Sequence, residues 1–197
     1  MFKKDSFGFL VSFCIAIIIL FLLKPDILPQ SKGQSTKWPE PKFEHITVKD
    51  GLPDNSVMCM IQDHLGFLWF GTLTGLVRYD GYEMTLYKND PNNPKSISHN
   101  IINVIFEDSE GTIWIGTGSD YDGALNRFDR STETFKQFFN DANDTTSISS
   151  NIVLSIFEDS KGRLWLGTQN GLNVYDKPSN SFKRFYYKKK SLFQKNI

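Results

Sequence analysis

The sequence contains few of the residues that most metal, redox and nucleophilic sites require. It has only three histidines and two cysteines among its 197 residues. The cysteines, Cys14 and Cys59, lie in separate apolar runs, so no disulfide framework is indicated. The histidines are scattered and no pair has the spacing of metal ligands, so no metal site is expected.

Charge of neither sign is in excess, because 22 basic residues balance 22 acidic ones. A neutral chain lacks the basic surface that nucleic-acid-binding proteins carry, so no nucleic acid partner is expected. Catalytic patterns are also missing: no Ser-His-Asp or Cys-His arrangement and no carboxylate pair can be assigned. We therefore expect a protein that needs no cofactor and is not an enzyme.

One long uncharged run lies near the N-terminus. A basic region at residues 1–6 precedes residues 7–23, which carry no charge. A helix of that length spans about 26 Å, near the lower limit for crossing a bilayer. No small-residue cleavage site follows closely, which favours an uncleaved transmembrane anchor over a cleaved signal peptide. Residues 24–42, with four prolines, are expected to form an extended linker.

The rest of the chain contains an internal repeat that is centred on Trp69, Trp114 and Trp165. An asparagine, an aspartate and a glycine precede each tryptophan at fixed distances, and a Gly-Thr pair follows it. Between the second and third copies, 14 of the 22 positions that start at Ser96 and Ser147 are identical. The other shared residues that we expect to be structural are Asp63, Asp108 and Asp159, then Gly66, Gly111 and Gly162, then Gly71, Gly116 and Gly167.

Each copy contains four short runs rich in β-branched and aromatic residues, separated by Gly, Asp, Asn and Ser, as expected for strands and hairpins. The expected strands are 57–63, 67–72, 76–80 and 83–88; then 102–108, 112–117, 125–129 and 135–140; then 153–159, 163–168, 172–176 and 182–187. The Asp-x-x-Gly segment between the first two strands predicts a tight turn whose glycine adopts a left-handed conformation.

Four strands in each period of about 45 to 51 residues predict β-propeller blades. The fold class is therefore all-β: a partial β-propeller of three four-stranded antiparallel blades, after an N-terminal hydrophobic helix. The blades within the propeller region 43–187 are expected at 51–88, 96–140 and 147–187. Residues 43–48 resemble a fourth strand and are predicted to be an orphan closing strand. The tryptophans are expected to pack between adjacent sheets.

The repeat resembles that of the two-component regulator propeller family. The resemblance rests on the pattern N-x7-D-x2-G-x2-W-x-G-T and on the following runs 75-GLVRYD-80, 124-ALNRFD-129 and 171-GLNVYD-176, and it covers about residues 43–187. It implies the extracytoplasmic sensor half of a hybrid histidine kinase of the Bacteroidetes type. In that family the propellers sense oligosaccharides, which makes an oligosaccharide or another small ligand the expected partner.

The sequence departs from the family in length. No His-(Asp/Glu)-x3-Pro phosphorylation box and no glycine-rich ATP loop is present, so kinase activity would belong to other domains. Residues 188–197 depart from the repeat and are expected to be an irregular tail. We interpret this departure as the truncation of a longer sensor gene.

Candidate ligand-binding residues are those that differ between the copies. The loop from the second to the third strand shares one end of a blade with the connection to the next blade. A four-residue insertion in the second copy places Asp120, Tyr121 and Asp122 there, and the connections add His99 and Asn143. Their chemistry suits sugar hydroxyls, but the same residue types are common in turns for purely conformational reasons.

The leading functional hypothesis is a ligand-sensing propeller held at the inner membrane by residues 7–23, with its blades in the periplasm. Export after signal cleavage is the alternative location. The alternative function is a membrane-anchored protein-interaction module without kinase domains. Three blades form an open arc, so exposed blade edges also predict self-association.

Overall fold

A computed structural model describes residues 40, 42–43, 45–120 and 122–186. The basic region, the hydrophobic run 7–23, nearly all of the linker and the tail 188–197 therefore lie outside the described residues. Within the described part of the chain, no helix is long and apolar enough to cross a membrane.

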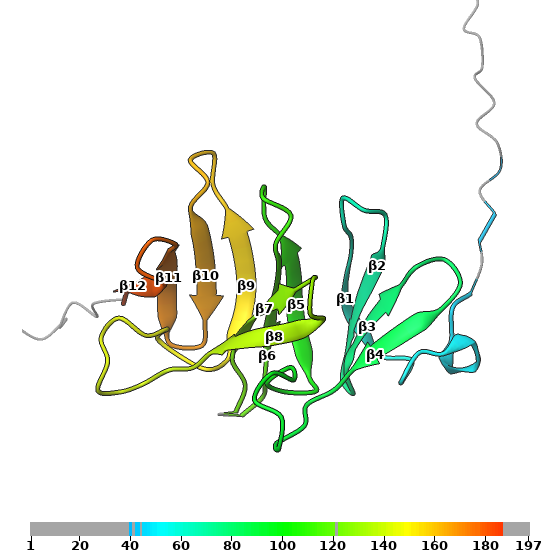
Figure 1. The fold of residues 1–197 in the computed structure, drawn as a ribbon, viewed down its shortest axis with the longest axis horizontal. Coiled ribbons are helices and arrows are strands. Elements are labelled where there is room, and N and C mark those ends of the chain that lie inside the picture. The colour runs from blue at the N-terminus through cyan, green and yellow to red at the C-terminus, as the bar shows by residue number, and fades with distance from the viewer. Residues whose placement is uncertain (1–39, 41, 44, 121, 187–197) are drawn as a thin grey trace, which may run out of the picture. The chain divides into compact units, whose positions relative to one another are not determined.

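The described residues form twelve strands in three antiparallel sheets of four (Figure 1). Blade 1 contains β1 (Val57–Gln62), β2 (Leu68–Thr72), β3 (Leu76–Tyr79) and β4 (Met84–Tyr87). Blade 2 contains β5 (Ile102–Glu107), β6 (Ile113–Thr117), β7 (Leu125–Asp129) and β8 (Thr134–Phe138). Blade 3 contains β9 (Val153–Glu158), β10 (Leu164–Thr168), β11 (Gly171–Asp176) and β12 (Ser181–Phe185). The prediction of three four-stranded blades is confirmed.

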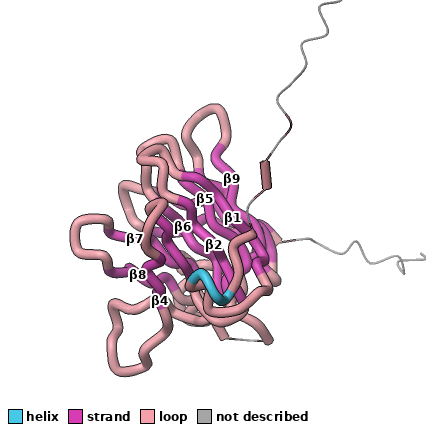
Figure 2. The backbone as a smooth tube through the Cα atoms, turned by 90° about the vertical axis from the view of Figure 1, so that its right-hand side faces the viewer, coloured by secondary structure: helices cyan, strands magenta, loops and turns pink. Residues whose placement is uncertain are grey.

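The first strand of each blade is the inner one. Strand β5 contacts both β1 and β9, and Figure 2 shows these three strands side by side. Within each sheet the strands follow in sequence order, so each blade is a simple meander whose last strand lies outermost. We call the side of a blade that faces the preceding blade its front face, and the opposite side its rear face.

The expected closing strand at residues 43–48 is not seen in its described residues, and the last blade that it was predicted to complete is not among the described blades. Its described residues carry no strand, and Val48–Asp50 forms a short 3-10 helix, η2. The Thr47 hydroxyl accepts a hydrogen bond from the Lys49 N–H, and the Asp50 carboxylate accepts one from the Thr47 N–H. This reciprocal cap stabilises the turn. A strand would need the free edge of another sheet as its partner, and the described blades pair only within themselves.

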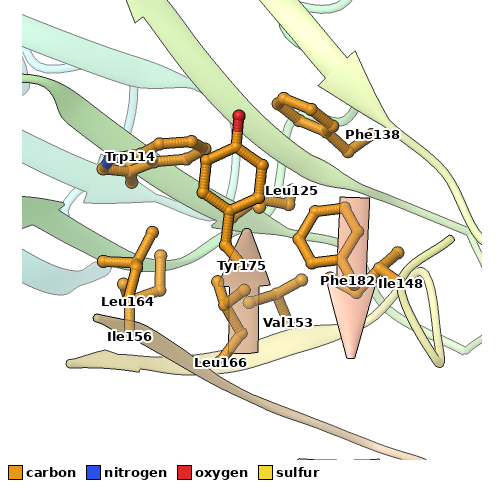
Figure 3. Packing of buried hydrophobic residues seen from close by; sticks show 10 residues of the cluster. All are labelled: Trp114, Leu125, Phe138, Ile148, Val153, Ile156, Leu164, Leu166, Tyr175 and Phe182. Carbon is orange, nitrogen blue, oxygen red and sulfur yellow. The ribbon is translucent and has the colours of Figure 1, made fainter. Parts of the chain in front are cut away.

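Apolar clusters fill both junctions between blades. The junction between blades 2 and 3 is shown in Figure 3, where Trp114 and Tyr175 lie against each other with ring centroids 5.1 Å apart. At the junction of blades 1 and 2, Trp69 meets Phe128 at the same centroid distance. Both of these tryptophans are fully buried, whereas Trp165 is only partly buried. Trp69 and Trp114 are thus each covered by the blade that follows, which is the packing between sheets that the repeat predicts, whereas Trp165 contacts Phe185 of its own blade.

The glycine that follows each tryptophan by two residues allows the next blade to approach closely. A Cβ on Gly71 would lie 2.7 Å from Ile102 Cγ2, and one on Gly116 would lie 2.9 Å from Val153 Cβ. Both neighbours are the first residues of the inner strand of the following blade. A Cβ on Gly167 would meet only its own blade, through the side chain of Ser155.

An aspartate organises the turn between the first two strands and also binds the tryptophan. Asp63 Oδ1 accepts the backbone N–H groups of Leu65 and Phe67, and its Oδ2 accepts Trp69 Nε1 at 2.8 Å. The matching bonds from Trp114 to Asp108 and from Trp165 to Asp159 are both 2.9 Å long. The turn glycines Gly66, Gly111 and Gly162 have φ of 91°, 78° and 71°, so the predicted left-handed conformation is confirmed.

Charged side chains link successive blades at this same end. Arg130 of blade 2 reaches Asp63 of blade 1 at 2.9 Å and Glu107 at 2.9 Å. Glu107 in turn accepts the His64 N–H at 2.8 Å. At the next junction, Glu158 accepts the N–H and the hydroxyl of Ser109, and Lys177 pairs with Glu110. The following blade therefore supplies a glutamate and a cation to the turn of the preceding blade.

The buried carboxylate of Asp63 is expected to contribute to stability in a pH-dependent way. Burial alone would raise the pKa of Asp63, but hydrogen bonds from Trp69 and Arg130 outweigh it and hold the pKa below the ordinary 3.8. A lowered folded pKa means that the stabilisation is present above that value and is lost as the pH falls through the folded pKa.

Replacing Asp63 by asparagine should lower the free energy of unfolding by about 2 kcal/mol, because the amide leaves a buried indole N–H or amide hydrogen unsatisfied. The substitution should also flatten the acid limb of the stability curve, measured by urea denaturation between pH 2 and 7. Asp159→Asn is the matched control, because its site is open to water that can replace lost bonds. An equal loss in the two variants would contradict the burial of this group by blade 2.

Gly116→Ala should lower the free energy of unfolding by about 1 to 3 kcal/mol, because the added methyl group lies 2.6 Å from Val104 Cγ1 of its own blade and 2.9 Å from Val153 Cβ of the next blade, which holds it from the other side. Gly167→Ala should cost clearly less, since the Ser155 side chain can rotate away. Thermal unfolding of the two variants provides the comparison. If both variants unfold at the same temperature, the glycine is not required for the approach of the following blade.

Candidate ligand-binding surface

The loops predicted to share one end of the blades do lie together. The N–H of Gly118, in the loop after β6, donates to the Ile101 carbonyl in the connection from blade 1. The N–H of Gln169, in the loop after β10, donates to the Ile152 carbonyl in the same way. In blades 2 and 3 the loop from the second to the third strand is therefore fixed against the entry to its own blade, at the end opposite the Asp-x-x-Gly turns.

A polar hollow of about 430 Å³ lies at this end of blade 3. Side chains that carry an amide or a hydroxyl line it throughout, and none of them is ionisable. The lining residues are Asn140, Ser149, Ser150, Asn151, Gln169 and Asn170. Such a surface can donate and accept hydrogen bonds without attracting ions of either sign.

Part of this lining already serves the fold. Asn151 Oδ1 accepts the Asn140 N–H at 2.7 Å, and Asn140 Nδ2 donates to the Ile148 carbonyl at 2.7 Å. Ser149 is buried, and its hydroxyl pairs with that of Thr168. These bonds fix the connection between blades 2 and 3, so these three residues are held rigidly.

The remaining groups are available to a ligand. Among the described residues, the side-chain amides of Gln169 and Asn170 have no hydrogen-bond partner, and both residues are exposed. The Nδ2 group of Asn151 is likewise not used within the described chain. Three amides on a rigid loop frame can therefore bind a polar, uncharged molecule.

The insertion residues lie at the matching position one blade earlier. Asp120 and Asp122 belong to a tight turn in which Ser119 and Asp122 pair with each other, and Asp120 has a φ of 58°. Tyr121 lies outside the described residues. The turn occupies the place in blade 2 that Gln169 and Asn170 occupy in blade 3, but neither Asp120 nor Asp122 lines the hollow.

The other two predicted ligand residues have local roles in turns. His99 Nδ1 accepts the Ile101 N–H at 3.0 Å, which shapes the entry to blade 2. Asn143 lies in the outer turn of the next connection, where its N–H donates to Asp141. The structure does not bring Asn143 to the hollow, and a ligand role for these five residues stays a prediction.

Sequence reasoning missed Gln169 and Asn170. They occupy the loop after the second strand, where the copies differ, because blade 1 has Leu73 and Thr74 at these positions. The criterion that selected Asp120 and Asp122 would have selected them as well. The loop of blade 3 has no insertion, so only its residue types distinguish it from the matching loops.

The described residues offer no cluster of three or more His, Cys, Asp or Glu side chains that could hold a metal ion. Burial raises the pKa of the Cys59 thiol to about 11 and that of the Tyr87 hydroxyl to about 12. Both groups are neutral at physiological pH and lie between blades, where they act as apolar packing residues rather than nucleophiles.

This geometry defines the chain as consecutive blades of a β-propeller with a polar surface at one end. The model of the family "two component regulator propeller" matches residues 51–74, 96–119 and 147–170, one segment in each blade. Each of the three blades therefore contains one segment that matches the two-component regulator propeller repeat, in agreement with the resemblance seen in the sequence.

Two similar proteins are described as a histidine kinase and as a hybrid two-component system. A protein of Formosa agariphila named histidine kinase P4 is 43% identical over 56 residues, which is 28% of this chain and 4% of that protein. The extracellular domain of a protein described as a hybrid two-component system from B. thetaiotaomicron has a TM-score of 0.66 and 27% identity, over 73% of this chain and 20% of that chain.

A second solved extracellular domain, described as a one-component system from B. thetaiotaomicron, has a TM-score of 0.55 and 34% identity. The match covers 68% of this chain and 19% of that chain. The present chain thus spans about a fifth of these extracellular domains and a much smaller share of the kinase.

The division of the hollow into structural and free side chains can be tested by stability. Asn151→Ala should lower the free energy of unfolding by about 1 kcal/mol, because it removes an acceptor from the Asn140 N–H. Gln169→Ala should change it by less than about 0.5 kcal/mol, since this side chain is exposed and makes no bond in the described structure. Chemical denaturation measures both. A larger loss for Gln169→Ala would show that this side chain supports the fold.

Proposed function

We propose that the chain forms part of the extracytoplasmic ligand-sensing propeller of a two-component system. The family of its repeats and the extracellular domains that resemble it support this assignment. The single observation that supports a binding function most directly is the polar hollow at the connection end of blade 3, with its free amide groups.

The ligand class that suits this hollow is a neutral oligosaccharide. Sugar hydroxyls both donate and accept hydrogen bonds, as do the amides of Asn151, Gln169 and Asn170. No ionisable side chain lines the hollow, so a charged ligand would find no ion pair there. Asp120, Asp122 and His99 would extend the binding surface along the same end of blade 2.

The chain itself would act by binding rather than by catalysis. In the described residues the carboxylates near the blade junctions are committed to Trp, Arg or backbone partners, and the buried Cys59 and Tyr87 are neutral. The match to histidine kinase P4 covers only 4% of that protein, so kinase activity is not transferred from it to these blades. In this proposal, residues 7–23 anchor the blades on the periplasmic side of the inner membrane.

A panel of neutral oligosaccharides tests the assignment. The full chain in detergent micelles should show a ligand-dependent rise in melting temperature with at least one oligosaccharide. The double variant Gln169→Ala/Asn170→Ala should keep its melting temperature without ligand. It should lose about tenfold or more in affinity, since the hydrogen bonds from two side-chain amides to the ligand are removed.

Leu73→Ala, in the matching loop of blade 1, is the control variant and should bind as the unmodified chain does. Undiminished binding by the double variant would exclude the hollow as the site. Binding of only charged ligands would exclude a neutral oligosaccharide as the ligand class.

A further inference from the structure

The rear face of blade 3 has the same design as the rear face of blade 2, but nothing in the described chain covers it. Leu125 and Phe138 of blade 2 are 0% and 7% exposed under blade 3. Their counterparts Leu172 and Phe185 are 41% and 40% exposed. Gly167, like Gly116, provides a position at which another inner strand can approach closely.

The front face of blade 1 has the apolar side chains that dock a blade onto its predecessor. Met60, Leu68 and Tyr79 occupy the register positions that Ile105, Ile113 and Phe128 occupy in blade 2, where these face blade 1. Met60 is 58% exposed. Val57, which pairs with Thr72 as Val153 pairs with Thr168, is also exposed and stands at the position that fits over a glycine.

The charged and polar side chains at the turn end of the blade 3 rear face distinguish one occupant of that face from another. At both internal junctions the following blade supplies the cation near the turn aspartate, through Arg130 or Lys177. Blade 3 supplies its own cation, because Arg163 Nε donates to Asp159 Oδ2 at 2.7 Å. Blade 1 has Gly81 at the position of Arg130 and Lys177, so it brings no cation that would compete with Arg163.

Ser160 of blade 3 and Gln62 of blade 1 have the chemistry to form one further polar contact. Ser109 donates its N–H and hydroxyl to Glu158 of the next blade. Ser160 stands at the same turn position in blade 3, and neither donor has an acceptor within the described residues. Gln62 stands at the position of Glu158 in blade 1, and its side-chain carbonyl oxygen is able to accept these hydrogen bonds.

We infer that the rear face of blade 3 docks the front face of blade 1 of a second copy of this chain. The contact is heterologous and head-to-tail, so it extends the stacking of blades from one copy to the next. Apolar contacts of Leu172 and Phe185 with the front of blade 1 provide its centre, and Ser160 with Gln62 forms its rim. A blade that carries Arg or Lys at the position of Gly81 fits less well, because two cations would then share Asp159.

Thiol cross-linking of the full chain in detergent micelles tests the contact. One preparation carries Gln62→Cys and the other Ser160→Cys, both in a Cys14→Ser background, and they are mixed before a short bis-maleimide reagent is added. A cross-linked heterodimer is expected from this mixture. The pair Leu73→Cys with Ser160→Cys is the control, because Leu73 lies in a loop at the other end of blade 1.

Two further variants should change the association between copies in opposite directions. Gln62→Glu should strengthen the association about fivefold, since a charged acceptor replaces a neutral one opposite Ser160. Leu172→Glu, placed on an exposed position of the rear face, should abolish the cross-link without unfolding the blade. The inference is overturned if the heterodimer is absent, if the control pair gives an equal yield, or if the cross-link persists with Leu172→Glu.

Discussion

Burial of a tryptophan by the following blade is the contact on which the rest of the structure depends. A single four-stranded meander leaves both of its faces uncovered, and a large aromatic side chain on one of them needs a partner surface. Phe128 covers Trp69, and Tyr175 covers Trp114. The aspartate that binds the indole N–H also organises the preceding turn, so local hairpin geometry and stacking between blades are linked through one carboxylate. Among the described residues nothing covers blade 3 in this way, and Leu172 and Phe185 on its rear face are exposed.

The repeated residues could be predicted from sequence because each answers a local or nearest-neighbour requirement. Gly66 must adopt a positive φ, Trp69 must be covered, and Gly71 must allow a strand to approach. The alternation and turn chemistry of the strands act over a few residues only, and the strand ends agreed with the structure to within about two residues. The closing strand at 43–48 stays a prediction, because it depends on the edge of a last blade that is not among the described blades.

The ligand surface was predicted less well because its residues belong to different segments. Asn140, Asn151 and Gln169 meet only after the loop of one blade folds against its entry connection. Substitutions that depend on each other were also missed. Ser98 donates its N–H to the buried Asn126, whereas blade 1 has Pro53 and Val77 at these two positions. Proline has no N–H, so the buried acceptor is not needed and an apolar residue takes its place. Such paired substitutions can be recognised only once the structure shows that the two residues are in contact.

Hydrogen exchange of the indole N–H groups, followed by NMR on a dilute, monomeric sample, tests the stacking of blades most directly. The account predicts that the indoles of Trp69 and Trp114 exchange only on unfolding of the blade stack, because they are buried and bound to Asp63 and Asp108. The indole of Trp165 should exchange much faster, because blade 3 has no following blade in the described chain. Equal exchange rates for all three indoles would contradict the claim that each blade is completed by its successor.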